Sequence, residues 1–425
     1  MVELLSPAGN LEKLKVAIHY GADAIYIGLK NFSLRANATN FDEDELKEAI
    51  QYLHEREKKI YVAINVYFTP DQTTSIIEKL KLLRNLKVDG IIISDIGLIK
   101  LAKEYAPSIN IHVSTQANTT NEQAVMFYRD LGVKRVILSR ELSLEHIKMI
   151  KSLVPDIELE VFVHGAMCIA YSGRCLLSSY MTKSGLTSSN IHNLNDKVRS
   201  ANKGDCSHSC RWEYFLIEKS RPNDHFIIDE DNNGSYILSS KDLAMIDYLD
   251  ELIEAGIDSF KIEGRMKSIL YISSIIRSYR NKIDHYYDKN ILYDREFIEK
   301  ELSVVSHREF CTGFFYDSPQ NNPNVITTEV SYQREMRLGA MVEDIKEGRA
   351  VLKIFNKLSK DNKLEYISLN TTKKIYEIHF FDNIGNTLDI VNNGQYVEAI
   401  FLDENKNSII PQKFDIIRID TGTRW

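Results

Sequence analysis

The sequence predicts an α/β fold: a (β/α)8 TIM-like barrel with a long cysteine-bearing insertion, followed by a small C-terminal antiparallel β-barrel domain. Through the first 265 residues, short runs rich in Ile and Val alternate with helix-length amphipathic segments. Several runs share one helix-turn-strand phrase, as in GADAIYIG, KVDGIIISD and AGIDSFKIEG. Near residue 330 the pattern changes to short alternating segments separated by turns such as DNIGN and NNG, which is typical of antiparallel β-structure.

Eight runs are predicted to be the strands of the barrel, in the order 2–7, 23–28, 60–65, 90–95, 109–114, 135–140, 159–165 and 259–264. This number fits a closed barrel better than an open sheet. Polar residues follow the apolar part of each strand, among them an Arg, a His and a Glu. Taken singly, such residues are often turn or cap residues. As a set they favour a functional site at the mouth of the barrel, where the carboxyl ends of the strands converge.

The length of 425 residues favours one large domain and one small one. We expect the barrel to occupy residues 1–270, interrupted by the insertion at about 165–245. A helical, aromatic segment at 271–329 is expected to connect it to a β-rich accessory domain at 330–425. Long insertions at the mouth of a barrel usually carry function.

The sequence predicts a cytoplasmic protein that does not associate with a membrane. It shows neither a signal-peptide pattern at its N-terminus nor an apolar run long enough to cross a bilayer. The net charge of −7 argues against non-specific coating of nucleic acid, although a local basic face can coexist with it. Five cysteines in a reducing compartment are expected to be metal ligands, catalytic thiols or core residues.

Four of the five cysteines lie in HGAMCIAYSGRC and GDCSHSC, with the spacing Cys-x6-Cys-x30-Cys-x3-Cys. Four thiolates can bind zinc or an iron-sulfur cluster, and the absence of tight Cys-x2-Cys pairs favours the cluster. A buried, purely structural role and a Cys-His nucleophile using His164 or His208 are the alternatives. Cys311 stands apart in an apolar setting and is expected to be a core residue. The signatures GxSxG, HExxH and GxxxxGK[ST] do not occur.

Several segments resemble the collagenase-like peptidases of unassigned catalytic type. They are ELLSPAGNLEKLKVAIHYGADAIYIG, EVFVHGAMCIAYSGRCLLSSYMT, ANKGDCSHSCRWEY, SSKDL and AGIDSFKIEGRMKS, and together they span essentially the whole chain. The resemblance is strongest to the branch that hydroxylates the wobble uridine of tRNA. It implies an oxygen-independent hydroxylase that forms 5-hydroxyuridine and depends on prephenate, a small anionic metabolite. The resemblance also implies a partner protein of the same family.

The resemblance further implies a 4Fe-4S cluster, with zinc as the less favoured metal. Its cysteine motif falls on Cys168, Cys175, Cys206 and Cys210. Some relatives place a ligand just after the SSKDL-like motif, where this chain has Ala244, so Cys210 is expected to supply the fourth thiolate. A cluster with four cysteine ligands has no open Lewis-acid position, which favours electron transfer or a structural role.

Site residues are predicted from their places at strand ends. A carboxylate donor needs guanidinium partners, and a nucleobase needs polar and stacking partners. The predicted proton-transfer residues are Glu160, His164 and Glu263. The predicted substrate-binding residues are Arg35, His112, Gln116, Arg140, Lys241 and Arg265, with Tyr26 or Tyr171 for stacking.

Three other functions remain open at this point. One is a collagenase-like peptidase that uses the cysteines as metal ligands or nucleophiles. Another is a hydroxylase of ribosomal RNA or of a quinone precursor. The third is a non-catalytic RNA-binding scaffold with a structural cluster.

Overall fold

The structure is a computed structural model of the chain. It describes residues 1–29, 41–65, 67–168, 172–175, 178, 206–207, 209, 230–231, 234–235, 240–316 and 335–422. The described residues form two compact units. The first draws on Met1–Leu11, Asp23–Met266 and Arg308–Val330, and the second on Glu12–Ala22, Lys267–His307 and Ser331–Trp425. The domain bounds drawn from the sequence stay predictions.

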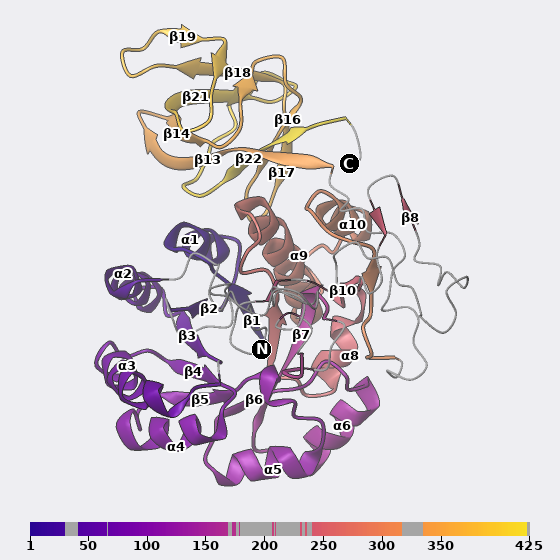
Figure 1. The fold of residues 1–425 in the computed structure, drawn as a ribbon. Helices are drawn as coiled ribbons and strands as arrows, with labels where there is room; N and C mark the ends of the chain where they lie inside the picture. Colours follow the sequence, from indigo (N-terminus) through magenta and orange to yellow (C-terminus); the bar gives the residue numbers. More distant parts are fainter. Residues whose placement is uncertain are drawn as a thin grey trace, which may run out of the picture. The chain divides into compact units, whose positions relative to one another are not determined.

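The first unit contains a closed barrel of eight parallel strands, which confirms the predicted fold (Figure 1). The order β11-β1-β2-β3-β4-β5-β6-β7 closes through the pairing of β11 with β7. Each predicted strand is present; their bounds are β1 (Glu3–Pro7), β2 (Ala24–Gly28), β3 (Lys59–Ile64), β4 (Gly90–Ile93), β5 (Asn110–Val113), β6 (Arg135–Ile137), β7 (Glu158–Ala166) and β11 (Ser259–Ile262). Most of their residues are buried, as expected for strands covered on both faces.

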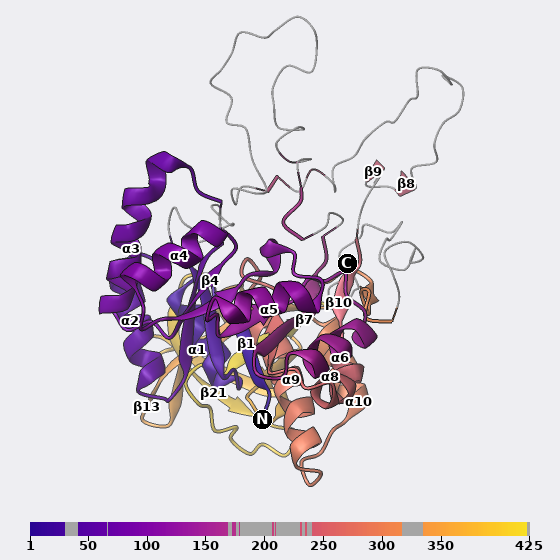
Figure 2. The same ribbon diagram turned by 90° about the horizontal axis from the view of Figure 1, so that it is seen from below.

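Amphipathic helices connect the strands of the barrel and lie outside it (Figure 2). They are α2 (Glu43–His54), α3 (Thr73–Asn85), α4 (Ile96–Tyr105), α5 (Glu122–Asp130), α6 (Leu144–Leu153) and α8 (Leu249–Glu254). The start of α2 is fixed by a capping box, in which Asp42 and Glu45 each accept the other's backbone N–H. Short 3-10 helices are η1 (Pro70–Gln72), η2 (Thr115–Ala117) and η5 (Ile246–Tyr248).

Strand β7 is nine residues long, and its last residues run beyond its parallel pairing with β11. There β10 (Asp242–Ala244) pairs with it in the antiparallel direction, with Asp242 opposite Ala166 and Ala244 opposite His164. Strand β12 (Phe310–Cys311) continues the sheet next to β10. A two-strand hairpin, β8 (Glu230–Asp231) and β9 (Gly234–Ser235), is also described in the insertion.

The second unit contains α1 (Leu11–His19, all but its first residue), α9 (Ile269–Tyr287), α10 (Arg295–Ser303) and a curled antiparallel sheet of eight strands. The strand order is β17-β16-β22-β13-β14-β21-β18-β19. The bounds are β13 (Met336–Lys346), β14 (Arg349–Ile354), β16 (Leu364–Ile367), β17 (Thr372–Ile375), β18 (Glu377–Phe381), β19 (Thr387–Leu388), β21 (Tyr396–Leu402) and β22 (Ile416–Asp420), with a separate pair β15 (Leu358–Ser359) and β20 (Ile390–Val391). This confirms the predicted β-rich C-terminal architecture.

Apolar side chains alternate into the core of this sheet, including Leu352, Phe380 and Phe401. A buried ion-pair network reinforces the unit, because Arg418 binds both Glu301 of α10 and Glu365 of β16. None of the helices in the described part of the chain is long and apolar enough to span a membrane.

Candidate functional site

The interior of the barrel holds a network of buried charges. Arg135 of β6 donates from Nη1 to Glu3 at 2.5 Å and to Glu160 at 3.0 Å. Lys261 of β11 donates from Nζ to the other oxygen of Glu160 at 2.7 Å. Glu160 is fully buried, and a buried carboxylate is tolerated only where cations and donors surround it. The network thus joins the four consecutive strands β6, β7, β11 and β1 inside the barrel.

The protonation states in this network follow from burial and charge. Burial disfavours the charged form of Glu3, but Arg135 outweighs it and lowers the pKa of that carboxyl below its usual value. Burial lowers the pKa of Lys261, and Glu160 opposes this shift. For Arg135, Glu160 and Glu3 more than offset burial and raise the pKa. Because Glu160 is bound by two cations, we interpret it as an organising carboxylate of the interior.

His112 of β5 lies in the same interior, with only 2% of its surface exposed. Its ring meets the Tyr61 ring edge-on, with the centroids 4.6 Å apart. Burial, reinforced by the positive charges of Arg135 and Lys261, holds the pKa of His112 well below its usual value. Within the described residues, its Nδ1 has no hydrogen-bond partner. His112 is therefore a neutral imidazole inside the barrel.

At the rim, β7 and β11 approach each other unusually closely at Gly165. The backbone of Gly165 has φ of +109°, and a Cβ there would lie 2.4 Å from the carbonyl oxygen of Glu263. The N–H of Glu263 donates to the carbonyl of His164 at 2.8 Å. Only glycine fits such a conformation without strain. The glycine thus brings together the backbones of two predicted proton-transfer residues, His164 of β7 and Glu263 directly after β11, and both residues are buried.

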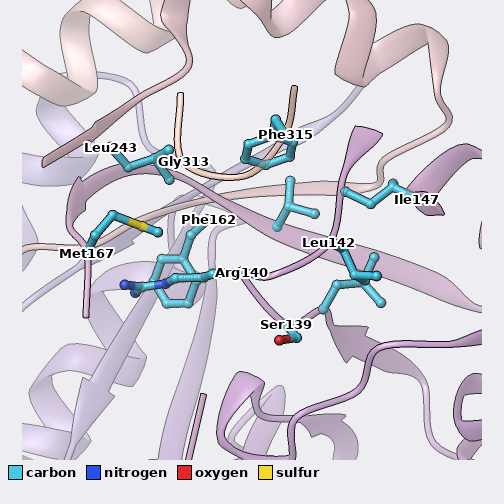
Figure 3. Close-up of a pocket in the computed structure, with 11 residues that line it drawn as sticks. Ser139, Arg140, Leu142, Ile147, Phe162, Met167, Leu243, Gly313 and Phe315 are labelled. Atoms are coloured by element: carbon cyan, nitrogen blue, oxygen red, sulfur yellow. The ribbon is translucent and has the colours of Figure 1, made fainter. Parts of the chain in front are cut away.

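Arg140 follows β6 and points its guanidinium across to β7. Its Nη1 donates to the carbonyl of Ala166 at 2.8 Å, and its Cζ lies 4.0 Å from the centroid of the Phe162 ring. Figure 3 shows this stacking at one side of a small pocket. The rest of the pocket lining is mostly apolar and includes Leu142, Met167 and Phe315. A cation is thus held at the end of β7, next to the start of the first cysteine segment.

Serine residues hold the backbone next to the described cysteines by hydrogen bonds. The hydroxyl of Ser240 donates to the carbonyl of Met167 at 2.7 Å, directly before Cys168. Ser172 donates its backbone N–H to Glu141 at 2.9 Å. The buried hydroxyls of Ser178 and Ser207 lie 3.0 Å apart, and the N–H of Ser207 donates to Ser178 at 2.9 Å. These last contacts join the segment that follows Cys175 to the segment that contains Cys206.

The thiols themselves differ in exposure: Cys168 is exposed, whereas Cys175 and Cys206 are partly buried. Cys210 and Arg35 lie outside the described residues, as does Tyr171. Among the residues that the structure describes, no group of three or more His, Cys, Asp or Glu side chains is placed to hold a metal ion. The four-cysteine ligand set therefore stays a prediction.

The remaining predicted substrate-binding residues lie at different points of the rim. Gln116 is in η2, and its backbone carbonyl accepts from the Tyr67 hydroxyl at 2.9 Å. Lys241 precedes β10 and forms an ion pair with Glu309 at 2.5 Å. Arg265 follows β11 and is 5% exposed. The structure thus places them around the mouth, whereas His112 and Glu160 lie deeper. Tyr26 of β2 is also interior, where its ring contacts Lys261.

Sequence reasoning missed several residues that organise the site. Arg135 and Lys261 lie within predicted strands and were given no role. The alternation of side chains between the two faces of β6 and β11 could have suggested that these cations point into the barrel. Asp242 and Arg308 form a buried ion pair at 2.6 Å beside the end of β7, and no local pattern links them. Glu141, which directly follows Arg140 after β6, was given no role.

The fold and the site place the chain among the (β/α)8-barrel proteins that carry a cysteine-bearing insertion at the mouth of the barrel. The chain matches Peptidase family U32 over residues 9–324, and it belongs to this family. It is 41% identical over 319 residues to the tRNA hydroxylation protein P1 of Bacillus subtilis, covering 75% of this chain and 71% of the relative. It is 35% identical over 412 residues to the tRNA hydroxylation protein P of Escherichia coli, covering 86% of each. It is also 36% identical over 286 residues to the 23S rRNA 5-hydroxycytidine synthase of Escherichia coli, covering 67% of this chain and 39% of the relative.

Proposed function

We propose that the chain is an RNA-hydroxylating enzyme that converts the wobble uridine of tRNA to 5-hydroxyuridine without molecular oxygen. The observation that carries the proposal is the similarity to tRNA hydroxylation proteins, which at 35% identity extends over 86% of this chain. The similarity to an rRNA 5-hydroxycytidine synthase supports the same kind of chemistry, because both names describe hydroxylation of RNA. Among RNA substrates, tRNA is favoured because the tRNA proteins match over a larger share of their own length.

A 4Fe-4S cluster bound by Cys168, Cys175, Cys206 and Cys210 is part of the proposal. The contact between Ser178 and Ser207 supports this ligand set, because it joins the segment that follows Cys175 to the segment that contains Cys206. Thiolates are the usual ligands of such clusters. With four cysteine ligands the cluster would supply electron transfer, since no iron is left open to act as a Lewis acid.

The residues of the mouth have proposed roles that follow from their geometry. Arg140 is already oriented by Ala166 and Phe162, so its guanidinium can bind the carboxylate of prephenate, the proposed co-substrate, with little loss of side-chain entropy. Arg265 is a second candidate for this carboxylate. His164 and Glu263, whose backbones are hydrogen-bonded at the rim, are the proposed proton-transfer residues. Glu160 is a weaker candidate, because it would have to give up two ion pairs.

The function is tested by nucleoside analysis of tRNA. The chain is expressed in a bacterial strain from which every gene for 5-hydroxyuridine formation has been removed. Mass spectrometry should then detect 5-hydroxyuridine or its derivatives in tRNA, and a strain unable to make prephenate should lose them. Absence of the modified nucleoside, with soluble protein present, would contradict the proposal.

The cluster is tested by anaerobic purification and iron analysis. The protein is expected to be brown, with about four irons per chain. Cys168→Ser should lose most of this iron, whereas Cys311→Ser is the matched control. Cys311 lies on β12, where burial raises the pKa of its thiol and disfavours the thiolate needed for a ligand. A colourless protein that contains zinc would overturn the cluster.

The name of the family makes a peptidase the second candidate function. A peptidase should cleave a protein substrate such as gelatin when the purified protein is added to it. Cleavage that depends on Cys168 or Cys175 and persists in protein without iron would favour the peptidase. Cleavage that is unchanged in both cysteine variants would instead indicate a contaminating protease.

A further inference from the structure

The carboxylate of Glu141 binds the first cysteine segment to the end of β6. Its Oε1 accepts the backbone N–H of Ser172 at 2.9 Å, and the Ser172 hydroxyl lies 3.3 Å from Oε1 and 3.2 Å from Oε2. The hydroxyl of Ser139 donates to Oε2. Both oxygens of Glu141 therefore accept hydrogen bonds. One partner, Ser139, lies in the same loop, and the other, Ser172, lies 31 positions later in the sequence.

A second, independent contact holds the same segment against the end of β5. Gly173 has φ of +74°, and a Cβ there would lie 2.1 Å from the carbonyl oxygen of Gln116. The hydroxyl of Thr115 also lies 3.5 Å from that of Ser172. The segment thus leaves the end of β7 at Cys168 and meets the ends of β6 and β5 within five residues.

These contacts restrict the position of Cys175. Cys175 lies three positions after Ser172, and an extended chain of that length spans at most about 11 Å. Three residues beyond it, the buried hydroxyl of Ser178 is bonded to Ser207, beside Cys206. Cys175 therefore lies on a short stretch whose two ends are both bound, one of them to the barrel.

We propose that Glu141 is a positioning residue that holds Ser172 so that Cys175 is presented, already ordered, to the other cysteines. The inference rests on the proposed metal-binding role of the cysteines. Outer residues that orient the ligands of a metal typically change its affinity by about 10- to 100-fold when they are removed. Among the described residues, Glu141 binds Ser139 and Ser172, and its effect on the metal passes through Ser172.

The test uses the full-length chain with Glu141→Ala, Glu141→Gln and a control, Glu145→Ala. Glu145 lies in the first turn of α6, four positions further on, and is exposed. Two readouts are taken. One is the rate at which iron leaves the anaerobically purified protein in the presence of EDTA. The other is the rate at which iodoacetamide alkylates Cys175 in the reduced, metal-free protein, followed by peptide mass spectrometry with Cys311 as the internal reference.

Glu141→Ala should release iron about 10- to 100-fold faster than the wild type and should alkylate Cys175 several-fold faster. Glu141→Gln keeps an oxygen that can accept the Ser172 N–H and should recover part of both losses. Glu145→Ala should match the wild type in both. Gly173→Ala breaks the second contact and should reproduce the effect of Glu141→Ala, which keeps the test valid should the alanine variant of Glu141 fail to fold.

The failure of this inference can be distinguished from failure of the proposed cofactor. A wild-type protein without bound iron overturns the cofactor, while alkylation of Cys175 still tests the role of Glu141. Wild-type protein that holds iron, with Glu141→Ala and Gly173→Ala unchanged in iron release and in alkylation, overturns the role of Glu141.

Discussion

The interior of the barrel and its mouth both bury polar groups, but they satisfy them in different ways. In the interior, side chains pair with side chains of opposite charge, as in Glu160 with Arg135 and Lys261. At the mouth, side chains mostly bind backbone groups, as in Arg140 with Ala166, Glu141 with Ser172 and Ser240 with Met167. In the first pattern the charged side chains neutralise one another, which leaves few of their hydrogen-bonding groups for a ligand. The second orders loops, which is what a site built on loops requires.

The difference predicts that the interior governs stability, and the largest effect is expected from Arg135→Met. The substitution removes the guanidinium from the buried carboxylate of Glu160 and from the partly buried carboxylates of Glu3 and Glu158, and should lower the free energy of unfolding by about 3–5 kcal/mol. Urea denaturation measures it. Arg349→Met is the matched control, because the pair of Arg349 with Glu398 is partly exposed and should contribute at most about 1 kcal/mol. Equal losses in the two variants would contradict a special role for the interior network.

Gly165→Ala tests the close packing of β7 against β11 at the rim, between the charged interior and the mouth. The added Cβ would collide with the Glu263 carbonyl and would force an unfavourable φ, so a loss of about 2–4 kcal/mol is expected. Gly385→Ala separates the two causes, because Gly385 has φ of +88° but open space around it. It should cost only about 1 kcal/mol, from the backbone alone. A similar loss at both glycines would mean that β7 and β11 separate easily at the rim.

His112 gives the interior a dependence on pH. Its pKa is lowered in the folded state, so the unfolded chain binds the proton first as the pH falls below the ordinary value of 6.5. Stability is therefore complete above that pH and declines below it, by up to about 1.4 kcal/mol for each pH unit. Urea denaturation at pH 7.5 and 5.5 measures the loss.

The control for this dependence is His112→Phe, which keeps an aromatic ring against Tyr61 but does not titrate. The variant should show a smaller loss between the two pH values than the wild type. Glu3 contributes in a separate window, because its lowered pKa places the loss below its ordinary value of 4.5. An identical pH dependence in wild type and variant would show that the pKa of His112 does not differ between the folded and unfolded states.

The smallest effect on stability is expected from Lys241→Gln at the mouth. Its ion pair with the half-exposed Glu309 should contribute at most about 1 kcal/mol. If Lys241 also contacts the RNA, binding of tRNA in a filter assay should weaken in Lys241→Gln but not in Glu309→Gln. Equal binding by the two variants would limit Lys241 to its ion pair.

The sequence was sufficient to predict the barrel because its signals are local. Each strand is a short apolar run after a turn, and eight of them were recognisable one at a time. The partners of a buried charge are not local: Glu160 binds Arg135 across 25 positions and Lys261 across 101. Glu160 therefore looked like a catalytic carboxylate near a cysteine motif. Glu141 could not be interpreted for the same reason, since its role depends on the path of the cysteine segment after β7.

The pairing of β10 with the end of β7 has a consequence for how such proteins can diversify. Asp242 lies opposite Ala166, and Ser240 binds Met167, so the insertion leaves the barrel and returns to it at adjoining backbone positions. When the ends of a loop are already fixed side by side, doubling its length costs only about 0.6 kcal/mol in chain entropy. Insertions of very different length can therefore replace one another between the ends of β7 and β10 without disrupting the strand pairing of the barrel. A graft between these two strands would also need Glu141 and Gln116, because the first cysteine segment lies against both of them.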